Sequence, residues 1–372
     1  MYDIAIIGAG PAGANLARLL GESYKVVVID RRDLESKYSA GPGNKCCGGL
    51  LAPDAQKMIA RLGLGVPTEV LVDPQLFAVR TIDVTNGIEK LYQRFYYNMD
   101  REKFDRWMVS LLSLGVDKRF NAVYKGYEPM KDGFTVHFTQ KGRRDSLKTR
   151  VLIGADGACS GVRKSISMGR AVPDTYIAIQ EWFENQLPQA YYTAIFDEEI
   201  SDFYSWIIPK NQYLVLGSAL KANDKTWEKY HKLKEKLTHY GFLFHHRVKK
   251  EGAFIYRPKH ANQLWAGKEG VALVGEAAGA ISPSSAEGIS YALKSSLFLA
   301  QSLNEGIEGF LGRYEKRLTK IRLNVIAKNA KAPFMYRPGL RKLVMQSGLQ
   351  SIRRTVVNQT SQDGNIFPES IK

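Results

Sequence analysis

The sequence predicts an α/β fold in which a parallel sheet with helices is interrupted by an inserted antiparallel sheet and followed by C-terminal helices. Residues 2–7 and 25–29 are short apolar strands, separated by a glycine-rich turn and an Ala/Leu-rich helix over 12–20, which is a βαβ unit. Buried strands recur at 151–154 and 271–275, each followed by a glycine-containing turn. Residues 175–220 alternate aromatic and aliphatic side chains with polar ones, which indicates antiparallel strands.

These patterns divide the 372 residues into a discontinuous Rossmann-type domain and an inserted sheet domain. We expect the Rossmann-type domain to comprise residues 1–75, 100–170 and 265–310. We expect the inserted sheet domain, which would bind the substrate, to comprise residues 76–99 and 171–264. The remaining residues, 311–372, are predicted to form a basic helical segment.

The first glycine-rich turn carries a dinucleotide-binding pattern. Its sequence is Gly8-Ala9-Gly10-Pro11-Ala12-Gly13, which is Gly-x-Gly-x-x-Gly between a strand and a helix. Gly8 allows a tight turn, Gly10 lets the backbone approach a pyrophosphate, and Gly13 lets the helix and strand pack closely. The pyrophosphate is expected at the helix N-terminus, where free N–H groups and the helix dipole favour an anion. Asp30 ends the next strand, where an acid accepts hydrogen bonds from a ribose hydroxyl.

The turns after the two later strands indicate which dinucleotide binds. One contains Asp156-Gly157; the other is Gly275-Glu276-Ala277-Ala278-Gly279, with Pro283 and Glu287-Gly288-Ile289 behind it. In this order the turns resemble the FAD-containing aromatic hydroxylase superfamily, which implies that FAD is the cofactor. The resemblance also implies that a helix starting near Gly288 directs its N-terminus at the flavin and stabilises the anionic reduced form. The superfamily usually has Asp at the position of Glu276.

The resemblance adds three further residues to the expected FAD site, namely Arg31, Arg101 and Val123. Arg101 begins an Arg-x-x-Phe-Asp pattern at the start of a predicted helix over 100–114, and a surface charge at a helix start is the alternative interpretation.

Two further stretches resemble the geranylgeranyl reductases within this superfamily. Lys45-Cys46-Cys47-Gly48-Gly49-Leu50 resembles their Lys-x-Cys-Gly-Gly loop, and Tyr204-Ser205-Trp206-Ile207-Ile208-Pro209-Lys210 resembles their Tyr-x-Trp-x-Phe-Pro-Lys strand, with Ile208 in place of Phe. The resemblance places Cys47, Gly48 and Gly49 beside the flavin. It also implies that Tyr204 and Trp206 line the substrate channel. We therefore name Cys47, Tyr204 and Trp206 as candidate catalytic residues; a small buried thiol and ordinary sheet core are the structural alternatives.

The function implied by this resemblance is reduction of a carbon–carbon double bond of an isoprenoid or similar apolar lipid by reduced FAD. The same fold also supports a monooxygenase that hydroxylates an aromatic or apolar molecule, and a non-catalytic flavin-binding lipid-associated protein is a third hypothesis. The sequence contains no second Gly-x-Gly-x-x-Gly. Electrons are therefore expected from NAD(P)H or another external donor that docks transiently.

The net charge of +16 is concentrated near the C-terminus. Between Gly312 and Val357 the only acid is Glu315, and the basic residues there include Arg353 and Arg354. We predict amphipathic basic helices. A solvated helical face packed on the flavin domain is the ordinary interpretation of such charge, and a surface that contacts an anionic membrane is the functional alternative. No nucleic-acid-binding motif accompanies the charge, so binding to nucleic acid is not expected.

The remaining composition points to an ordinary globular protein. The first strand begins at residue 2, so we expect no signal peptide, and no apolar run reaches the roughly 18 residues of a membrane span. The three cysteines form neither a disulfide framework nor a metal-ligand pattern, so no metal site is predicted. We expect a cytoplasmic protein in peripheral contact with the membrane. The oligomeric state is not predicted.

Overall fold

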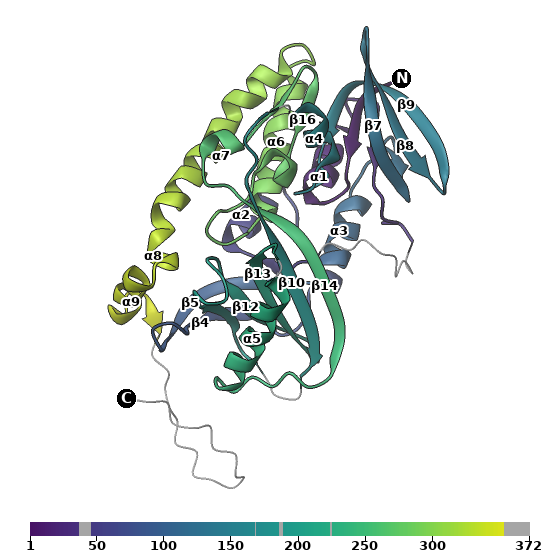
Figure 1. The fold of residues 1–372 in the computed structure, drawn as a ribbon. Coiled ribbons are helices and arrows are strands. Elements are labelled where there is room, and N and C mark those ends of the chain that lie inside the picture. The colour runs from purple at the N-terminus through teal and green to yellow at the C-terminus, as the bar shows by residue number, and fades with distance from the viewer. Residues whose placement is uncertain (37–45, 168, 186–188, 224, 353–372) are drawn as a thin grey trace.

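A computed structural model of the chain describes residues 1–36, 46–167, 169–185, 189–223 and 225–352. The glycine-rich stretch Tyr38–Lys45 and the basic residues Arg353 and Arg354 lie outside the described residues. Figure 1 shows two sheets, one near each end of the molecule, with a long helix running beside both. The predicted α/β fold with an antiparallel sheet and C-terminal helices is confirmed.

The first sheet has the strand order β15-β16-β9-β1-β2-β6. Strands β16, β9, β1, β2 and β6 are parallel, because β-α-β connections return the chain in the same direction. Strands β7 and β8 extend the sheet from β9 as an antiparallel meander. The strands are β1 (Tyr2–Ile7), β2 (Val26–Ile29), β6 (Asp117–Arg119), β7 (Ala122–Met130), β8 (Gly133–Gln140), β9 (Arg143–Gly154), β15 (Gly267–Lys268) and β16 (Val271–Leu273).

Helices cover this sheet and bury the side chains of its central strands. Strand β2 is Val-Val-Val-Ile and is buried throughout, as expected for a parallel strand covered on both faces. Asn15 donates to the Ser296 hydroxyl at 2.8 Å and joins the first helix to a helix almost 300 residues later. The helices of this part are α1 (Pro11–Leu20), α2 (Pro53–Arg61), α3 (Arg101–Ser110), α4 (Gly161–Ile166) and α6 (Ile289–Asn304), with the 3₁₀ turns η1 (Thr68–Val70), η2 (Ala261–Gln263) and η3 (Gly275–Ala278).

The second sheet has the order β14-β10-β13-β12-β11-β4-β5-β17. All neighbours are antiparallel except β11 and β4, which are parallel. The β4–β5 hairpin comes from much earlier in the sequence than the other strands in this order, which all follow residue 173. The strands are β3 (Leu50–Leu51), paired with β5, then β4 (Leu76–Asp83), β5 (Ile88–Asn98), β10 (Asp174–Glu184), β11 (Tyr192–Phe196), β12 (Ser205–Lys210), β13 (Tyr213–Lys221), β14 (Arg247–Arg257) and β17 (Ser351–Ile352).

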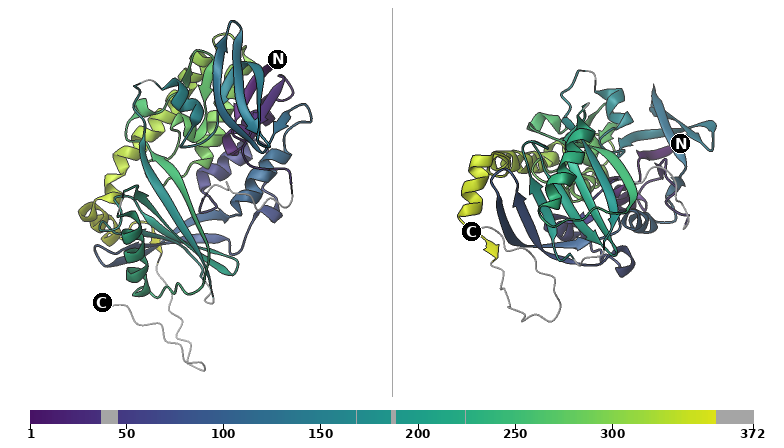
Figure 2. Two further views of the ribbon diagram at one scale, coloured as in Figure 1. Left: turned by 45° about the vertical axis from the view of Figure 1, so that its right-hand side comes forward. Right: turned by 60° about the horizontal axis from the view of Figure 1, so that its bottom comes forward.

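The two faces of the second sheet have different partners. Helix α5 (Thr226–Thr238) covers one face, where Tyr230, Leu233 and Leu237 are fully buried against the strands. The opposite face carries the aromatic cluster of Tyr192, Phe196 and Trp206. Figure 2 shows the sheet from two further sides, with α5 on its outer surface. The aromatic face is therefore turned toward the rest of the molecule.

The C-terminal segment consists of α7 (Phe310–Lys331), α8 (Pro333–Tyr336) and α9 (Pro338–Gln346). It connects the two sheets, since α7 packs on α6 and α9 lies beside β5. The expectation that the whole segment is helical is wrong at its end, because Ser351–Ile352 forms β17 and pairs with β5. Three other bounds differ from the predicted ones. Tyr204 precedes β12 instead of beginning the strand, and the helix predicted over 100–114 ends at Ser110. The strand predicted over 271–275 ends at Leu273, and η3 begins at Gly275.

Candidate active site

Three glycine turns meet where β1, β9 and β16 end. A Cβ atom on Gly8 would lie 2.5 Å from the carbonyl oxygen of Ala155, and one on Gly275 would lie 2.9 Å from the Cβ of Ala12. Both glycines have positive φ, of 102° and 59°, which residues with side chains rarely adopt. The carboxyl ends of parallel strands share one edge of the sheet, so three segments far apart in sequence form one crevice there.

The backbone at the start of α1 fits a pyrophosphate. A Cβ on Gly10 would meet no protein atom within 4 Å, so the space above this residue is open to a ligand. A Cβ on Gly13 would lie 1.8 Å from the Gly8 carbonyl oxygen, so Gly13 serves the close packing of α1 on β1. Pro11 is the first residue of α1, and the first turn carries no acid to repel an anion.

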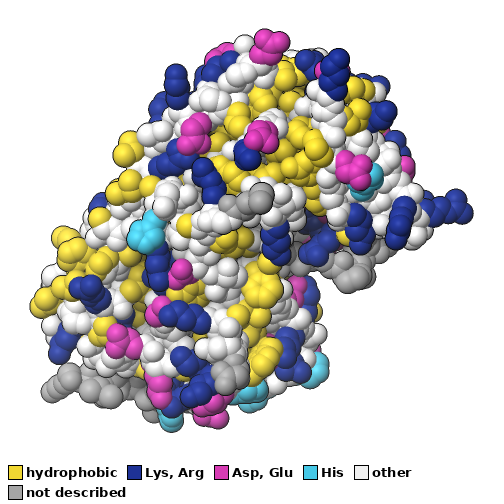
Figure 3. All heavy atoms as spheres, turned by 45° about the horizontal axis from the view of Figure 1, so that its top comes forward, with side chains coloured by type: hydrophobic (Ala, Val, Ile, Leu, Met, Phe, Trp, Pro, Cys, Tyr) yellow, Lys and Arg dark blue, Asp and Glu magenta, His cyan; other side chains and the backbone are white. Residues whose placement is uncertain are grey.

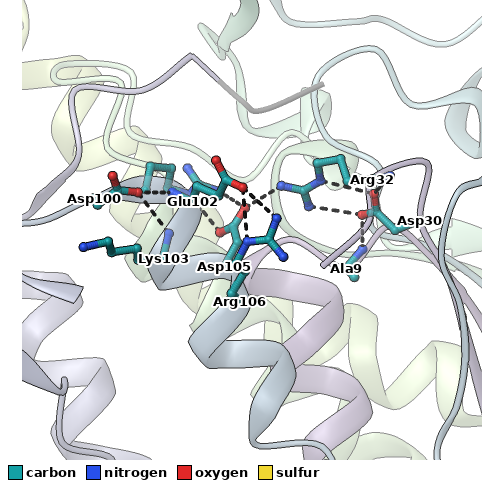
Figure 4. A network of polar contacts seen from close by, with 9 residues as sticks. Ala9, Asp30, Arg32, Asp100, Glu102, Lys103, Asp105 and Arg106 are labelled. Atoms are coloured by element: carbon teal, nitrogen blue, oxygen red, sulfur yellow. Dashed lines mark hydrogen bonds and ion pairs between the residues drawn. The ribbon is translucent and has the colours of Figure 1, made fainter. Parts of the chain in front are cut away.

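Asp30 directly follows β2 and is 7% exposed. Its carboxylate accepts from the Ala9 backbone N–H at 2.7 Å, and its backbone carbonyl accepts from the N–H of Ala122, next to Val123. The guanidinium of Arg32 donates to the Asp30 carboxylate at 3.1 Å (Figure 4). Arg31, which the sequence predicted as a cofactor residue, is exposed, and its role stays a prediction. Arg32 was not predicted from the sequence, because its partner Asp105 is 73 residues away.

Asp105 joins Arg32 to Arg101. Its carboxylate accepts from Arg32 at 2.7 Å and from Arg101 Nε at 2.9 Å, and its side chain is 1% exposed (Figure 4). Burial alone would raise the pKa of Asp105, but the two guanidinium groups outweigh burial and lower it. Arg101 is also hydrogen-bonded to the side chain of Cys47, and this contact and Asp105 together overcome burial and raise its pKa. A continuous network of ion pairs therefore runs from Asp30 to Arg101, beside Cys47.

The acids of the second and third turns are engaged by the protein itself. The Asp156 carboxylate accepts from the Gly161 N–H at 2.7 Å and from the Ser160 hydroxyl, so it fixes the turn into α4, and burial raises its pKa. Glu276 accepts from the Tyr256 N–H at 2.9 Å while its side chain also lines a cavity. In the same region Gly157 and Gly279 have positive φ, and the Pro283 carbonyl accepts from Arg257 at 3.2 Å.

A cavity of about 550 Å³ lies between the crevice and the second sheet. Its lining is mainly apolar and combines the predicted flavin-side residues with side chains from β4, β5, β11, β12 and α8–α9. The predicted site residues that line it are Cys47, Gly48, Gly49, Arg101, Tyr204, Trp206, Glu276, Glu287, Gly288 and Ile289. The structure thus brings the three candidate catalytic residues to one space.

Two buried polar residues hold the loop that carries Cys47. With its amide oxygen turned toward both donors, Gln180 accepts from the Gly48 N–H at 3.1 Å and from Trp206 Nε1 at 2.9 Å. Lys210 donates to the Met99 carbonyl and the Asn98 side chain, both at 2.7 Å, and to the Gly49 carbonyl at 3.3 Å. Burial lowers the pKa of Lys210 to about 8.

Of the two residues that hold the Cys47 loop, Gln180 was not predicted as a site residue from the sequence. Its local signal was a polar residue amid the apolar residues of β10 (Asp174–Glu184). Lys210 was quoted as the end of a motif, without a role. A Cβ on Gly48 would lie 2.7 Å from Cδ1 of Ile208, the residue that replaces the usual Phe.

Tyr204 and Trp206 form one wall of the cavity, with ring centroids 5.5 Å apart. The Tyr204 hydroxyl donates to the Ser285 carbonyl at 2.7 Å, and burial raises its pKa well above the usual value. Tyr204 is therefore a hydrogen-bond donor and a poor proton source near neutral pH. Cys47 has a free thiol, and its sulfur accepts from the Gly49 N–H at 3.4 Å.

The N-terminus of α6 faces the same cavity. Gly288 is the residue before the helix, and Gly288 and Ile289 both line the space. The Glu287 carboxylate accepts from the Ser290 N–H at 2.7 Å and so caps the helix. Burial raises the pKa of Glu287. Within the described residues, no group of three or more His, Cys, Asp or Glu side chains could hold a metal ion.

The sequence matches the family described as FAD binding domain over residues 1–320. The chain belongs to this family. It is also 39% identical over 353 residues to the protein CbrA of Escherichia coli O9:H4, a match that covers 94% of each chain. The CbrA of Escherichia coli K12 is 38% identical and is covered over 98% of its length.

Solved structures share the fold at low sequence identity. A geranylgeranyl bacteriochlorophyll reductase-like protein from Thermoplasma acidophilum has a TM-score of 0.74 at 18% identity, covering 93% of this chain and 98% of its own. PqsL of Pseudomonas aeruginosa, a probable FAD-dependent monooxygenase, has a TM-score of 0.65 at 17% identity, with 93% and 99% covered. The solved structures share the fold of this chain, and the family match shows that its cofactor is FAD.

Proposed function

We propose that this flavoprotein reduces a carbon–carbon double bond of an isoprenoid or similar apolar lipid. The observation that carries the proposal is the cavity, whose mainly apolar lining runs from Cys47 and Gly288 to Phe196 and Phe334. A lining of this kind binds an apolar chain by excluding water, and polar groups among it, such as Arg101 and Glu276, can orient the ligand. Tyr192 and Ala194 of β11 also line the cavity and extend its apolar wall along the second sheet.

The residues of the loop and of α3 have distinct tasks in this proposal. FAD, when bound and reduced, supplies a hydride to one carbon of the double bond. The thiol of Cys47 gives a proton to the neighbouring carbon, so that the double bond becomes a single bond with two added hydrogen atoms. The Arg101 guanidinium, hydrogen-bonded to Cys47, stabilises the thiolate that remains until solvent returns a proton.

Tyr204 has a positioning task rather than a chemical one. Its proton is committed to the Ser285 carbonyl, and its ring packs on Trp206 in the cavity wall. Electrons reach the flavin from NAD(P)H or another external donor that docks transiently, since the sequence has only one Gly-x-Gly-x-x-Gly.

An anaerobic reoxidation experiment tests the proposal. The purified protein is reduced with dithionite, prenyl lipids are added, and flavin absorbance and product mass are followed together. Reoxidation with a product heavier by two hydrogen atoms is the expected result. Flavin that stays reduced with every alkene tested would contradict it.

The same experiment separates the two other candidate functions. The fold shared with PqsL favours a monooxygenase as the second candidate, and this would reoxidise only after oxygen enters, with a product heavier by one oxygen atom. A non-catalytic lipid-associated protein would bind the lipid without any change in its flavin.

The role of Cys47 has its own test. Loss of a positioned acid typically slows turnover by about 100-fold or more, so Cys47→Ala should do so with FAD still bound. Cys159→Ala changes an exposed thiol and is the matched control. If Cys47→Ala turns over at the wild-type rate, the proton comes from another group.

A further inference from the structure

Helix α9 buries Arg341 and Met345 and turns Leu343 and Val344 outward. Arg341 is 4% exposed and forms a bidentate ion pair with buried Asp83, through Nε at 2.7 Å and a terminal nitrogen at 2.8 Å. Leu343 is 66% exposed and Val344 39% exposed. Surface helices of proteins that meet only water usually have the reverse pattern. The buried ion pair fixes this orientation.

The outward side chains belong to a larger surface that we name the apolar rim, formed by Phe334 and Met335 of α8 and Leu343 and Val344 of α9. All four are more than a third exposed. Contiguous exposed apolar residues of this size commonly mark a contact surface. In Figure 3 the side of the molecule that carries α8 and α9 shows hydrophobic side chains interspersed with Lys and Arg.

The charges that α8, α9 and the end of α7 place beside the apolar rim have one sign. Lys331, Arg337 and Lys342 are exposed beside it. Across residues 310–352 the only acid is Glu315, near the other end of α7. The surface is therefore apolar at its centre and positive at its edge, which is the composition of a surface that lies on anionic lipid.

The cavity and the apolar rim are continuous. Phe334, Met335 and Val344 each line the cavity while also being exposed to solvent. Cys47 and Gly288 lie at the flavin side of the same space. The cavity therefore opens among the exposed side chains of α8 and α9.

We propose that the apolar rim docks on the surface of an anionic lipid bilayer. The four apolar side chains would enter the boundary between head groups and acyl chains, and the three cations would meet anionic head groups. A second copy of this chain fits less well, because a two-fold contact through this surface would bring like charges together. On the proposed function, a lipid substrate then passes between bilayer and cavity without crossing water; the docking itself does not depend on that function.

Sedimentation of the FAD-loaded full chain with vesicles tests the docking. We expect binding to vesicles rich in phosphatidylglycerol and much weaker binding to pure phosphatidylcholine. Leu343→Ser should lower the partition coefficient about tenfold, since a large side chain no longer enters the boundary. Lys331→Gln and Lys342→Gln should each lower it about fivefold, with the effect reduced by salt.

Leu114→Ser is the matched control, because Leu114 is fully exposed in the turn that follows α3, and α3 lies away from α9 (Figure 1). Equal vesicle binding by wild type, Leu343→Ser and Leu114→Ser would overturn the proposal. So would a dimer that Leu343→Ser dissociates while vesicles bind neither protein, which would assign the rim to a second copy. Sedimentation needs no turnover, so a failed reoxidation experiment would leave this result standing.

Discussion

The two ends of the candidate site, at the first glycine turn and at the Cys47 loop, are built from different chemistry. At the first glycine turn, charged groups pair with one another: Asp30 and Asp105 accept from Arg32, and Asp105 also accepts from Arg101. At the Cys47 loop, the buried cation Lys210 donates to uncharged acceptors, the carbonyls of Gly49 and Met99 and the side chain of Asn98. The first arrangement keeps its groups charged, whereas the second lowers the pKa of the cation.

Paired charges form a rigid polar frame, which suits a ligand that carries its own polar hydrogen-bonding groups. The cavity beside the Cys47 loop is mainly apolar, with Arg94, Arg101 and Arg341 among its lining residues. The predictions below alter each end in turn.

The largest effect should come from Asp105→Asn. The substitution removes the carboxylate charge that Arg32 and Arg101 share, so two buried guanidinium groups lose an ion-pair partner. Breaking a buried ion pair in this way lowers the unfolding free energy by about 3–5 kcal/mol. Urea denaturation measures the loss. Glu102→Gln, which breaks the partly exposed pair with Arg106 on the same helix, should cost less than about 1 kcal/mol. Similar losses in the two variants would contradict the assigned frame.

Lys210→Met should change the pH dependence of stability. Between about pH 8, the pKa of Lys210 in the folded protein, and its ordinary value of 10.5, the unfolded chain binds a proton that the folded chain does not. Wild-type stability relative to the variant should therefore rise with pH across this window, by about 3 kcal/mol in total. Below about pH 8 the difference should be constant. Urea denaturation at several pH values checks this, and a flat difference up to pH 10 would refute it.

Gly10→Val should weaken FAD binding and leave the apoprotein folded. The added side chain meets no protein atom at its Cβ but occupies the space of the pyrophosphate, so a clash of about 1–3 kcal/mol corresponds to roughly 10–100-fold in affinity. Titration of the apoprotein with FAD measures the change. Gly312→Val adds the same side chain in open space on α7 and serves as the control. Equal FAD affinity in both variants would show that the ligand does not approach Gly10.

The smallest effect should come from Tyr204→Phe. The variant keeps the ring contact with Trp206 and loses one hydrogen bond to Ser285, which is worth about 0.5–1.5 kcal/mol. Turnover should fall less than about tenfold, and the pH profile below pH 10 should keep its shape because the raised pKa of Tyr204 excludes its titration there. A loss of several hundredfold would make Tyr204 the proton donor instead of Cys47.

Local patterns predicted much of the fold and the cofactor crevice. A glycine turn between a strand and a helix has a fixed geometry, so the turn at Gly8–Gly13 and the acid at Asp30 could be assigned from neighbours in the sequence. The order of the three turns along the chain indicated FAD, and the family match confirms it. The aromatic alternation after residue 175 predicted strands that the second sheet contains.

The sequence by itself therefore determined the backbone turns, the cofactor and the type of each sheet. Only the tertiary structure decided which side chains meet: Arg32 with Asp105, Gln180 with Trp206, and Arg341 with Asp83, a pair 258 residues apart. It also decided that the basic C-terminal helices line the cavity and present Leu343 to solvent. The physical reason is that turn geometry depends on adjacent residues, whereas side-chain partners depend on the order of strands and on packing between distant segments.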